Sequence, residues 1–187
     1  DQPLELSVSL ENIKNILKRA KPTDGVIISH EKGDNRLKID LTGGSKRSFN
    51  IPLINLDASE QRIPSLKFTS KVEMPSDQFD EAVEDVGIIA ESVALILNDG
   101  KFYINSENNL SEAKVELPST EAIIITSSGD DILARYSLDY MRKMIKGSKL
   151  ADNVLIEFNR DYPMRLSYIV TDKVYLSFIL APRVSND

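Results

Sequence analysis

The stretch Ser137-Leu138-Asp139 repeats the stretch Ser9-Leu10-Glu11 at a distance of 128 positions (138 − 10). Both stretches are followed by apolar residues at the spacing of an amphipathic helix. A later apolar run, Val26-Ile27-Ile28, returns as Val154-Leu155-Ile156 at the same distance (154 − 26). A constant offset across a helix, a loop and a strand indicates a duplicated unit. The alternative, that any two helices flanked by strands resemble each other, would make the unbroken register a coincidence.

The first copy reads as a strand, a helix and three further strands. Residues 4–10 alternate between apolar and polar side chains, which predicts a half-buried strand, and the helical spacing that follows predicts a helix over 11–20. Turn residues then separate predicted strands at 26–30, 37–41 and 49–53. Within the repeat, Leu37-Lys38-Ile39 matches Leu166-Ser167-Tyr168 with a slip of one residue.

A polar segment divides the chain. We expect residues 1–54 to be the C-terminal part of a first domain, 55–65 a connecting loop and 66–187 a second domain. The second domain is predicted to contain a strand over 66–74, a helix over 76–90, strands near 93–97, 101–106, 113–117 and 122–126, and then the second copy of the repeat. The strand and helix of 66–90 have no counterpart before Leu4, and the chain opens on Asp1 rather than Met. We therefore expect the N-terminal part of the first domain to be missing.

Composition narrows the class of protein. The 187 residues are 41% hydrophobic and 28% charged, as in soluble globular proteins. The absence of cysteine excludes disulfides, thiolate metal sites and a cysteine nucleophile. No apolar run approaches the roughly 20 residues that span a bilayer, so a cytosolic protein without membrane contact is expected. The net charge of -6 disfavours tight DNA binding over the whole surface but permits local basic patches.

The sequence offers little for catalysis. The single histidine, His30, has no serine or aspartate partner at a fixed spacing, so a structural or surface role is expected. The turns Asp34-Asn35 and Asp130-Asp131 lack calcium-loop spacing. Gly43-Gly44-Ser45-Lys46 lacks the earlier glycine of a phosphate-binding loop and reads as a hairpin turn. We expect no enzyme activity, no metal and no cofactor.

Three motifs carry a resemblance to a known family. They are the tail Phe178-Ile179-Leu180-Ala181-Pro182-Arg183-Val184, the linker 56–64 with the sequence Leu-Asp-Ala-Ser-Glu-Gln-Arg-Ile-Pro, and the helix start Met74-Pro75-Ser76-Asp77-Gln78-Phe79. Together, in this order, they resemble the DNA sliding clamps, and specifically the archaeal type of the proliferating cell nuclear antigen family. The resemblance implies an α+β fold with a duplicated clamp domain, antiparallel sheets outside, and helices lining a ring of three subunits.

The resemblance also implies a function and partners. A sliding clamp is a processivity factor that encircles double-stranded DNA without sequence preference and tethers DNA polymerase, flap endonuclease and DNA ligase, after a clamp loader has opened it. The ring is a homotrimer or a heterotrimer, in the archaeal cytoplasm or in a eukaryotic nucleus. A subunit of a DNA-damage checkpoint clamp is the alternative within the fold. An unrelated α+β enzyme is a third possibility, which the lack of a convergent catalytic cluster disfavours.

The resemblance implies that basic residues on the helices face DNA, whereas without it they read as a solvated polar face. The positions concerned are Lys14, Lys18, Arg19, Lys21, Arg142, Lys143, Lys146 and Lys149. The helix after Pro75 departs from the family pattern, because it carries acidic residues where the family commonly has basic ones. A DNA-facing role for that helix is therefore in doubt.

Two further surfaces follow from the resemblance. A hydrophobic groove for partner peptides is expected at Ile63, Pro64, Pro163, Ile179, Leu180, Ala181, Pro182 and Arg183, although each apolar member alone fits core packing equally well. Subunit contacts are expected between edge strands that contain Phe49, Ile51, Leu53, Ala113, Val115 and Leu117. The alternative is a pair of unpaired edges protected by Pro52 and Lys114.

Overall fold

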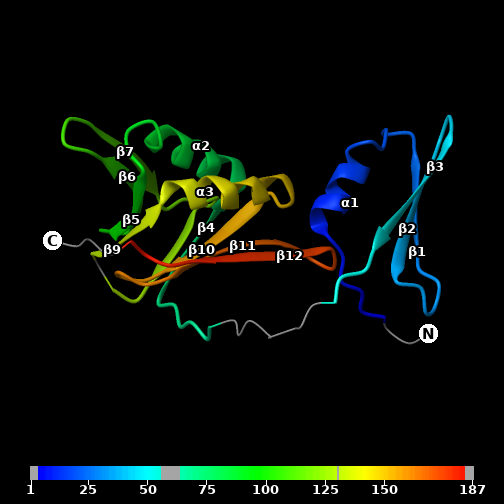
Figure 1. The fold of residues 1–187 in the computed structure, drawn as a ribbon. Helices are drawn as coiled ribbons and strands as arrows, with labels where there is room; N and C mark the ends of the chain where they lie inside the picture. The colour runs from blue at the N-terminus through cyan, green and yellow to red at the C-terminus, as the bar shows by residue number, and fades with distance from the viewer. Residues whose placement is uncertain (1–3, 56–63, 130, 184–187) are drawn as a thin grey trace. The chain divides into compact units, whose positions relative to one another are not determined.

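The computed structural model describes residues 4–55, 64–129 and 131–183. Its contacts divide the chain into two compact units, Asp1–Ile63 (unit 1) and Pro64–Asp187 (unit 2), shown in Figure 1. Among the described residues, no helix is long and apolar enough to cross a membrane.

Unit 1 is a short helix packed on a three-stranded antiparallel sheet. The helix α1 (Leu10–Leu17) begins after Ser9, whose Oγ accepts a hydrogen bond from the backbone N–H of Asn12 at 3.4 Å, as an N-cap does. The sheet has the order β1 (Gly25–Ser29), β2 (Arg36–Thr42), β3 (Lys46–Pro52). The buried core is small and consists of Ile16, Leu37, Ile39, Leu41 and Ile51.

The predicted strand over residues 4–10 is largely wrong. Only Val8 pairs, through an isolated antiparallel bridge to Leu53, and Leu10 already belongs to α1. The neighbouring strand β3 ends at Pro52, and just beyond it the N–H of Ile54 donates to the carbonyl of Ser7 at 2.8 Å. Alternation alone could not reveal that this partner strand stops.

Unit 2 contains two antiparallel sheets. One has the order β12 (Val174–Leu180), β11 (Met164–Val170), β10 (Asn153–Phe158), β4 (Ser70–Pro75), β8 (Ile124–Ser127). The other has the order β7 (Glu112–Pro118), β6 (Lys101–Glu107), β5 (Ser92–Asn98), β9 (Ile132–Ser137). The helices are α2 (Ser76–Val86) and α3 (Leu138–Met144), and α3 continues into a 3-10 turn, η1 (Ile145–Lys149).

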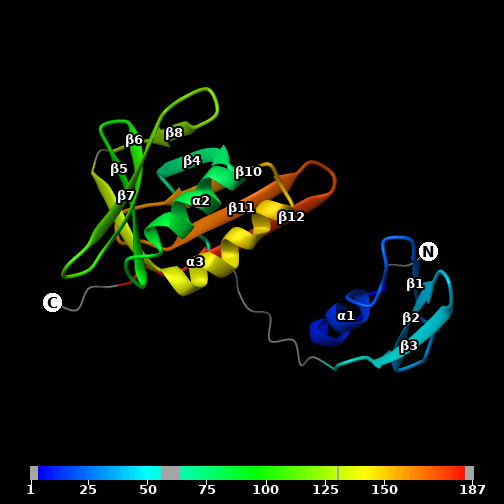
Figure 2. The ribbon, with the colours of Figure 1, turned by 90° about the horizontal axis from the view of Figure 1, so that it is seen from above.

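The two helices of unit 2 form one layer over the sheets, as Figures 1 and 2 show. Their apolar faces close a core that includes Phe79 and Met141 from the helices and Val154 and Tyr168 from the sheet, all fully buried. The approach of η1 to β11 is very close, because a Cβ added to Gly147 would lie 2.4 Å from two ring carbons of Tyr168. Only glycine fits at this point of the layer.

The structure confirms the internal repeat. The elements α3, β10, β11 and β12 each begin 128 positions after α1, β1, β2 and β3 (138 − 10, 153 − 25, 164 − 36 and 174 − 46). The one-residue offset predicted between the residues of β2 and those of β11 has the opposite sign, however. Val26 pairs with Leu41 and Val154 pairs with Tyr168, so the inward-facing residues of β2 and β11 correspond at 127 (168 − 41) rather than 129.

The two copies differ in how they cover the equivalent strands β1 and β10. Strand β10 lies between β11 and β4, and its Val154 and Ile156 are fully buried. Among the described residues, strand β1 pairs only with β2, and all five of its residues are exposed, including Val26, Ile27 and Ile28. An edge of this composition is an apolar surface open to further pairing.

Two predicted boundaries in unit 2 shift. The strand expected from residue 66 begins at Ser70, and the helix expected to reach residue 90 ends at Val86. Gly87 follows as the C-cap, and its N–H still reaches the carbonyl of Val83 at 3.0 Å. The connecting loop predicted over 55–65 lies mostly outside the described residues.

Candidate nucleic-acid and partner-binding sites

The basic residues predicted to face DNA occupy equivalent positions in the two copies of the repeat. Lys14, Lys18 and Lys21 recur 128 positions later as Arg142, Lys146 and Lys149 (142 − 14, 146 − 18, 149 − 21). All are exposed except Arg142, which is half-buried, and the remaining two predicted residues, Arg19 and Lys143, are exposed as well. In unit 2 the predicted cations lie on α3 (Arg142 and Lys143) and on η1 (Lys146 and Lys149). In unit 1 the helix predicted to reach residue 20 ends at Leu17, so only Lys14 lies within α1, Lys18 is its C-cap, and Arg19 and Lys21 lie beyond its end.

Arg142 alone among these cations is tied to a neighbouring helix. Its Nε donates to Oε2 of Glu84 at 3.3 Å, and its Nη2 donates to the carbonyl of Gly87 at 3.0 Å. No ion pair found in the described part of the chain involves Lys14, Lys18, Lys146 or Lys149. This contact could not be predicted from the sequence, because the partners lie more than fifty positions apart.

The acidic helix α2 lies beside α3 and exposes its charges. Asp77, Glu81, Glu84 and Asp85 are exposed, whereas Phe79, Ala82, Val83 and Val86 form the buried face. The departure from the family pattern noted in the sequence is thus a property of the surface and not of the core. These carboxylates would repel a phosphate backbone that approached α2.

Asp80 is the one acidic residue of α2 that points partly inward. Its Oδ2 accepts a hydrogen bond from the hydroxyl of Ser148 at 2.5 Å, and its buried Oδ1 has no partner among the described residues. Burial, assisted by the negative charges of Glu84 and Asp77, raises the pKa of this carboxyl above its ordinary value, although the bond from Ser148 opposes the shift. The pKa of the nearby Tyr168 hydroxyl is also raised, chiefly by burial and further by the charge of Asp80.

The predicted partner groove falls at the end of β12 and on the loop before β11. Ile179 is 38% exposed, while Leu180 packs against the core of unit 2, and Pro163 and Pro182 are half-buried. Pro64, Ala181 and Arg183 are exposed, and Ile63 lies outside the described residues.

Strand β9 fixes both the loop and the tail of this groove. The buried Tyr136 donates its hydroxyl to the carbonyl of Tyr162 at 2.7 Å, next to Pro163. The backbone N–H of Arg183 bonds the carbonyl of Arg135 at 2.7 Å. The tail therefore lies in a defined position relative to the loop.

An aromatic and cationic cluster beside Ile179 was missed in the sequence. Arg165 pairs with Ile179 across the β11–β12 ladder, and its guanidinium lies 5.0 Å from the ring centroid of Phe68. Phe68 meets the ring of Tyr162 edge-on with centroids 6.1 Å apart. Phe68 is distant in sequence from Tyr162 and Arg165 and comes near them because β4 and β11 both pair with β10, so no local signal could have revealed the cluster.

The strands predicted to form subunit contacts are both sheet edges. Strand β3 ends the sheet of unit 1 and β7 ends the four-stranded sheet of unit 2. They share one burial pattern, in which Phe49, Ala113 and Val115 are half-buried and Ile51 and Leu117 are buried. Leu53 lies just beyond β3 and is already paired with Val8, so it is not part of the open edge.

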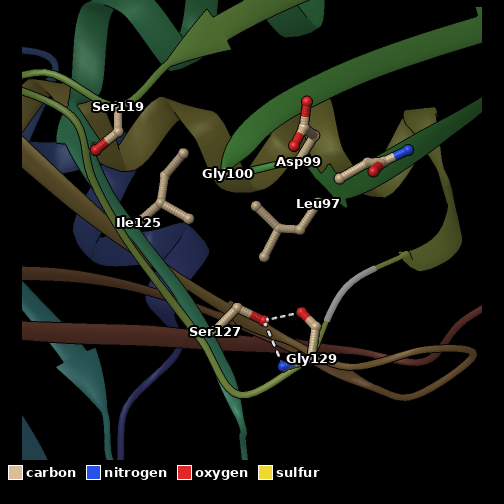
Figure 3. Close-up of a pocket in the computed structure, with 8 residues that line it drawn as sticks. Leu97, Asp99, Gly100, Ser119, Ile125, Ser127 and Gly129 are labelled. Atoms are coloured by element: carbon tan, nitrogen blue, oxygen red, sulfur yellow. Dashed lines mark hydrogen bonds between the residues drawn. The ribbon is translucent and has the colours of Figure 1, made fainter.

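The pocket in Figure 3 lies between the β5–β6 turn and β8. Leu97 and Ile125 form its apolar side, and the Ser127 hydroxyl donates to the Gly129 carbonyl at 2.7 Å. Among the described residues that line it, Asp99 is the only titratable one. Among the described residues, no group of three or more histidine, cysteine, aspartate or glutamate side chains could hold a metal ion. The ring Nε2 of His30 bonds the carbonyl of Asp34 at 2.9 Å across a turn, in line with the structural role predicted for it.

A repeated unit of one helix and three antiparallel strands, with helices layered over sheets and basic residues at equivalent helix positions, defines the class of duplicated clamp folds. A crystal structure of PCNA from Thermococcus kodakaraensis has this fold, with a TM-score of 0.81 and 28% identity over 94% of this chain and 72% of that chain.

Sequence comparison agrees. Residues 62–183 match the family "Proliferating cell nuclear antigen, C-terminal domain". The DNA polymerase sliding clamp of Thermococcus gammatolerans is 31% identical over 100% of this chain and 75% of its own length. That of Pyrococcus furiosus is 32% identical over 99% and 74%. The chain belongs to the proliferating cell nuclear antigen family.

The buried carboxyl of Asp80 yields a test of the helical layer. Its raised pKa means that the folded state favours the protonated form more than the unfolded chain does, so its stabilising contribution is present below the ordinary value of 3.8 and is lost as the pH rises through the folded pKa. Asp80→Asn should therefore raise the melting temperature at about pH 7, with the two proteins converging as the pH falls below about 4.

The matched control is Glu81→Gln, which removes the same charge from the adjacent exposed position. It should give a smaller change in melting temperature. A lower melting temperature for Asp80→Asn at neutral pH would show that the ionised carboxylate stabilises the fold.

Proposed function

We propose that this chain is a subunit of a DNA polymerase sliding clamp, a non-enzymatic processivity factor that encircles duplex DNA. The observation that carries the proposal is the match along nearly the whole chain to archaeal proteins named as such clamps. Because these relatives are named as polymerase clamps, the checkpoint clamp is not favoured. We further propose that it works on the archaeal nucleoid in the cytoplasm.

The proposed DNA contact is electrostatic and weak. The cations Lys14, Lys18 and Lys21, with Lys146 and Lys149, stand exposed at repeat-equivalent positions. Exposed lysines neutralise phosphates without reading bases, which gives attraction without a fixed register. A clamp requires this kind of contact, since it must move along the duplex while topology prevents its escape.

The proposed partner site is the surface around Ile179 and Pro163. It combines an exposed apolar side chain, a tail fixed to β9, and the aromatic rings of Phe68 and Tyr162. Such a surface suits a short helical turn with aromatic anchors, followed by backbone pairing with the tail. Polymerase, flap endonuclease, ligase and the clamp loader are the proposed partners.

The proposed subunit contact joins β3 of one copy to β7 of another in a trimeric ring. Both edges are seven residues long and keep half-buried apolar side chains that a further strand would cover. The exposed charges differ in sign, since β3 exposes Lys46, whereas β7 exposes Glu112 and Glu116 beside Lys114. Cross-strand pairs of opposite charge favour this pairing.

Topological tethering is tested on circular DNA. The chain, loaded by a clamp loader onto a nicked plasmid, should remain bound to the closed circle and be lost after one restriction cut, because no tight contact holds it on the linear form. Retention is measured by gel filtration before and after the cut. Equal retention on both forms would mean direct DNA binding and would refute the clamp.

The partner groove is tested with a peptide that carries two aromatic anchors after a helical turn. Ile179→Ala should weaken its binding about five- to tenfold, as truncation of an interface anchor does, measured by fluorescence polarisation. Tyr175→Ala is the control, because Tyr175 is exposed on the same face of β12 four residues earlier. Equal losses for the two variants would place the peptide elsewhere.

Subunit pairing is tested from both strands. Phe49→Asp and Val115→Asp each place a charge in the side-chain layer that pairing would bury, so each should lower the association of the chain in sedimentation equilibrium. Ile124→Asp, on the exposed edge strand β8, should leave the mass unchanged. An oligomer that survives both substitutions would rule out the β3–β7 contact.

A further inference from the structure

Arg142 and its repeat equivalent Lys14 use their charges differently. Lys14 is exposed on α1 and takes part in no ion pair among the described residues. Arg142 uses two of the five N–H donors of an arginine to bond α2 and its C-cap. One donates to the carboxylate of Glu84 at 3.3 Å and the other to the carbonyl of Gly87 at 3.0 Å. At this position of the repeat, the cation of unit 1 has no ion pair among the described residues, whereas the cation of unit 2 is bonded to a neighbouring helix.

The small residue Gly87 leaves space for the guanidinium of Arg142 beside the end of α2. A Cβ at position 87 would lie 2.7 Å from Nη2 of Arg142 and 2.9 Å from a methyl carbon of Leu138, so a larger residue there would displace the guanidinium from its present position. Helix α2 ends at Val86, and carbonyl groups at a helix C-terminus carry partial negative charge. The guanidinium thus lies between a full negative charge and a helix end that both attract it.

We propose that Glu84 is a positioning residue that holds the guanidinium of Arg142 on α2 and so withholds its charge from the phosphate backbone of DNA. The inference rests on the proposed function, in which α3 faces the duplex. The side chain of Arg142 is 38% exposed and that of Glu84 is 58% exposed, so the tie lies at the surface, where its strength is modest. A released arginine would reach phosphates with the geometry that its planar fork suits best.

Glu84 has a second, simpler effect that the test must separate. Any carboxylate on α2 repels DNA, whether or not it touches Arg142. Glu81 supplies the matched control, because it is exposed on the same helix one turn earlier and forms no ion pair among the described residues. Glu84→Gln and Glu81→Gln remove the same charge, and only the first removes the ion pair with Arg142.

The experiment measures the affinity of the full chain for a short linear duplex of arbitrary sequence as a function of salt concentration. Glu84→Gln should bind several-fold more tightly than Glu81→Gln, and its log K against log salt should be steeper by about one contact. When Arg142→Ala is added to each variant, the extra affinity of Glu84→Gln for DNA should disappear, while the affinity gained by Glu81→Gln should remain. This result would show coupling between Glu84 and Arg142 in a double-mutant cycle.

Two outcomes would overturn the inference. One is equal affinity and equal salt dependence for Glu84→Gln and Glu81→Gln, and the other is a gain of Glu84→Gln that persists with Arg142→Ala. Nitrogen-15 NMR of the Arg142 Nε–H gives a second readout, since DNA should shift this resonance more in Glu84→Gln than in the unsubstituted chain. Linear binding requires no ring, so loss of retention on circular plasmid would refute the proposed function separately.

Discussion

The ring of Tyr168 leaves no space for a side chain at position 147, and the placement of the helical layer of unit 2 depends on that contact. Because η1 touches β11 there, Lys146 and Lys149 on either side of Gly147 are directed to the surface. Ser148, in the same turn, reaches Asp80 of α2. This close approach between a 3-10 turn and a strand therefore places two of the basic residues at the surface, and Ser148 links the same turn to the acidic helix.

The electrostatic character of unit 2 follows from this arrangement. The exposed face of α2 is acidic, and α3 with η1 is basic, so two bands of opposite sign lie side by side. Arg142 and Glu84 meet where the bands touch. A duplex close to this layer would be attracted to one helix and repelled by the other, which confines its path to the basic band and makes the balance sensitive to single charges.

Much of the fold could be predicted from the sequence, since the repeat and the alternation of apolar residues are local or periodic signals. They located α1, α3 and nearly every strand, and they placed Lys18 and Lys146 as equivalents. The predictions that were wrong concerned residues whose pairing partners are distant in sequence. The unpaired segment before α1 needed knowledge of where β3 ends, and the slip between β2 and β11 needed the strand register.

The site was predicted less completely for the same reason. Basic residues on a helix are visible in sequence, but the tie between Arg142 and Glu84 is not. The cluster of Phe68, Tyr162 and Arg165 beside Ile179 arises only when β11 pairs with β12 and the segment before β4 passes alongside. Motif resemblance pointed to the tail and the loop before β11, whereas the surroundings that shape them had to be observed.

The bare edge of β1 means that the free energy of folding is unevenly distributed along the chain. In the part of unit 1 that the structure describes, five apolar side chains are buried, and the residues of β1 contribute none of them. Small cores of this kind open locally long before a larger core does, and amide protons on an uncovered strand exchange first. Any strand that docked along β1 would therefore stabilise all of unit 1 by mass action, so that covering this edge and folding the unit become a single equilibrium.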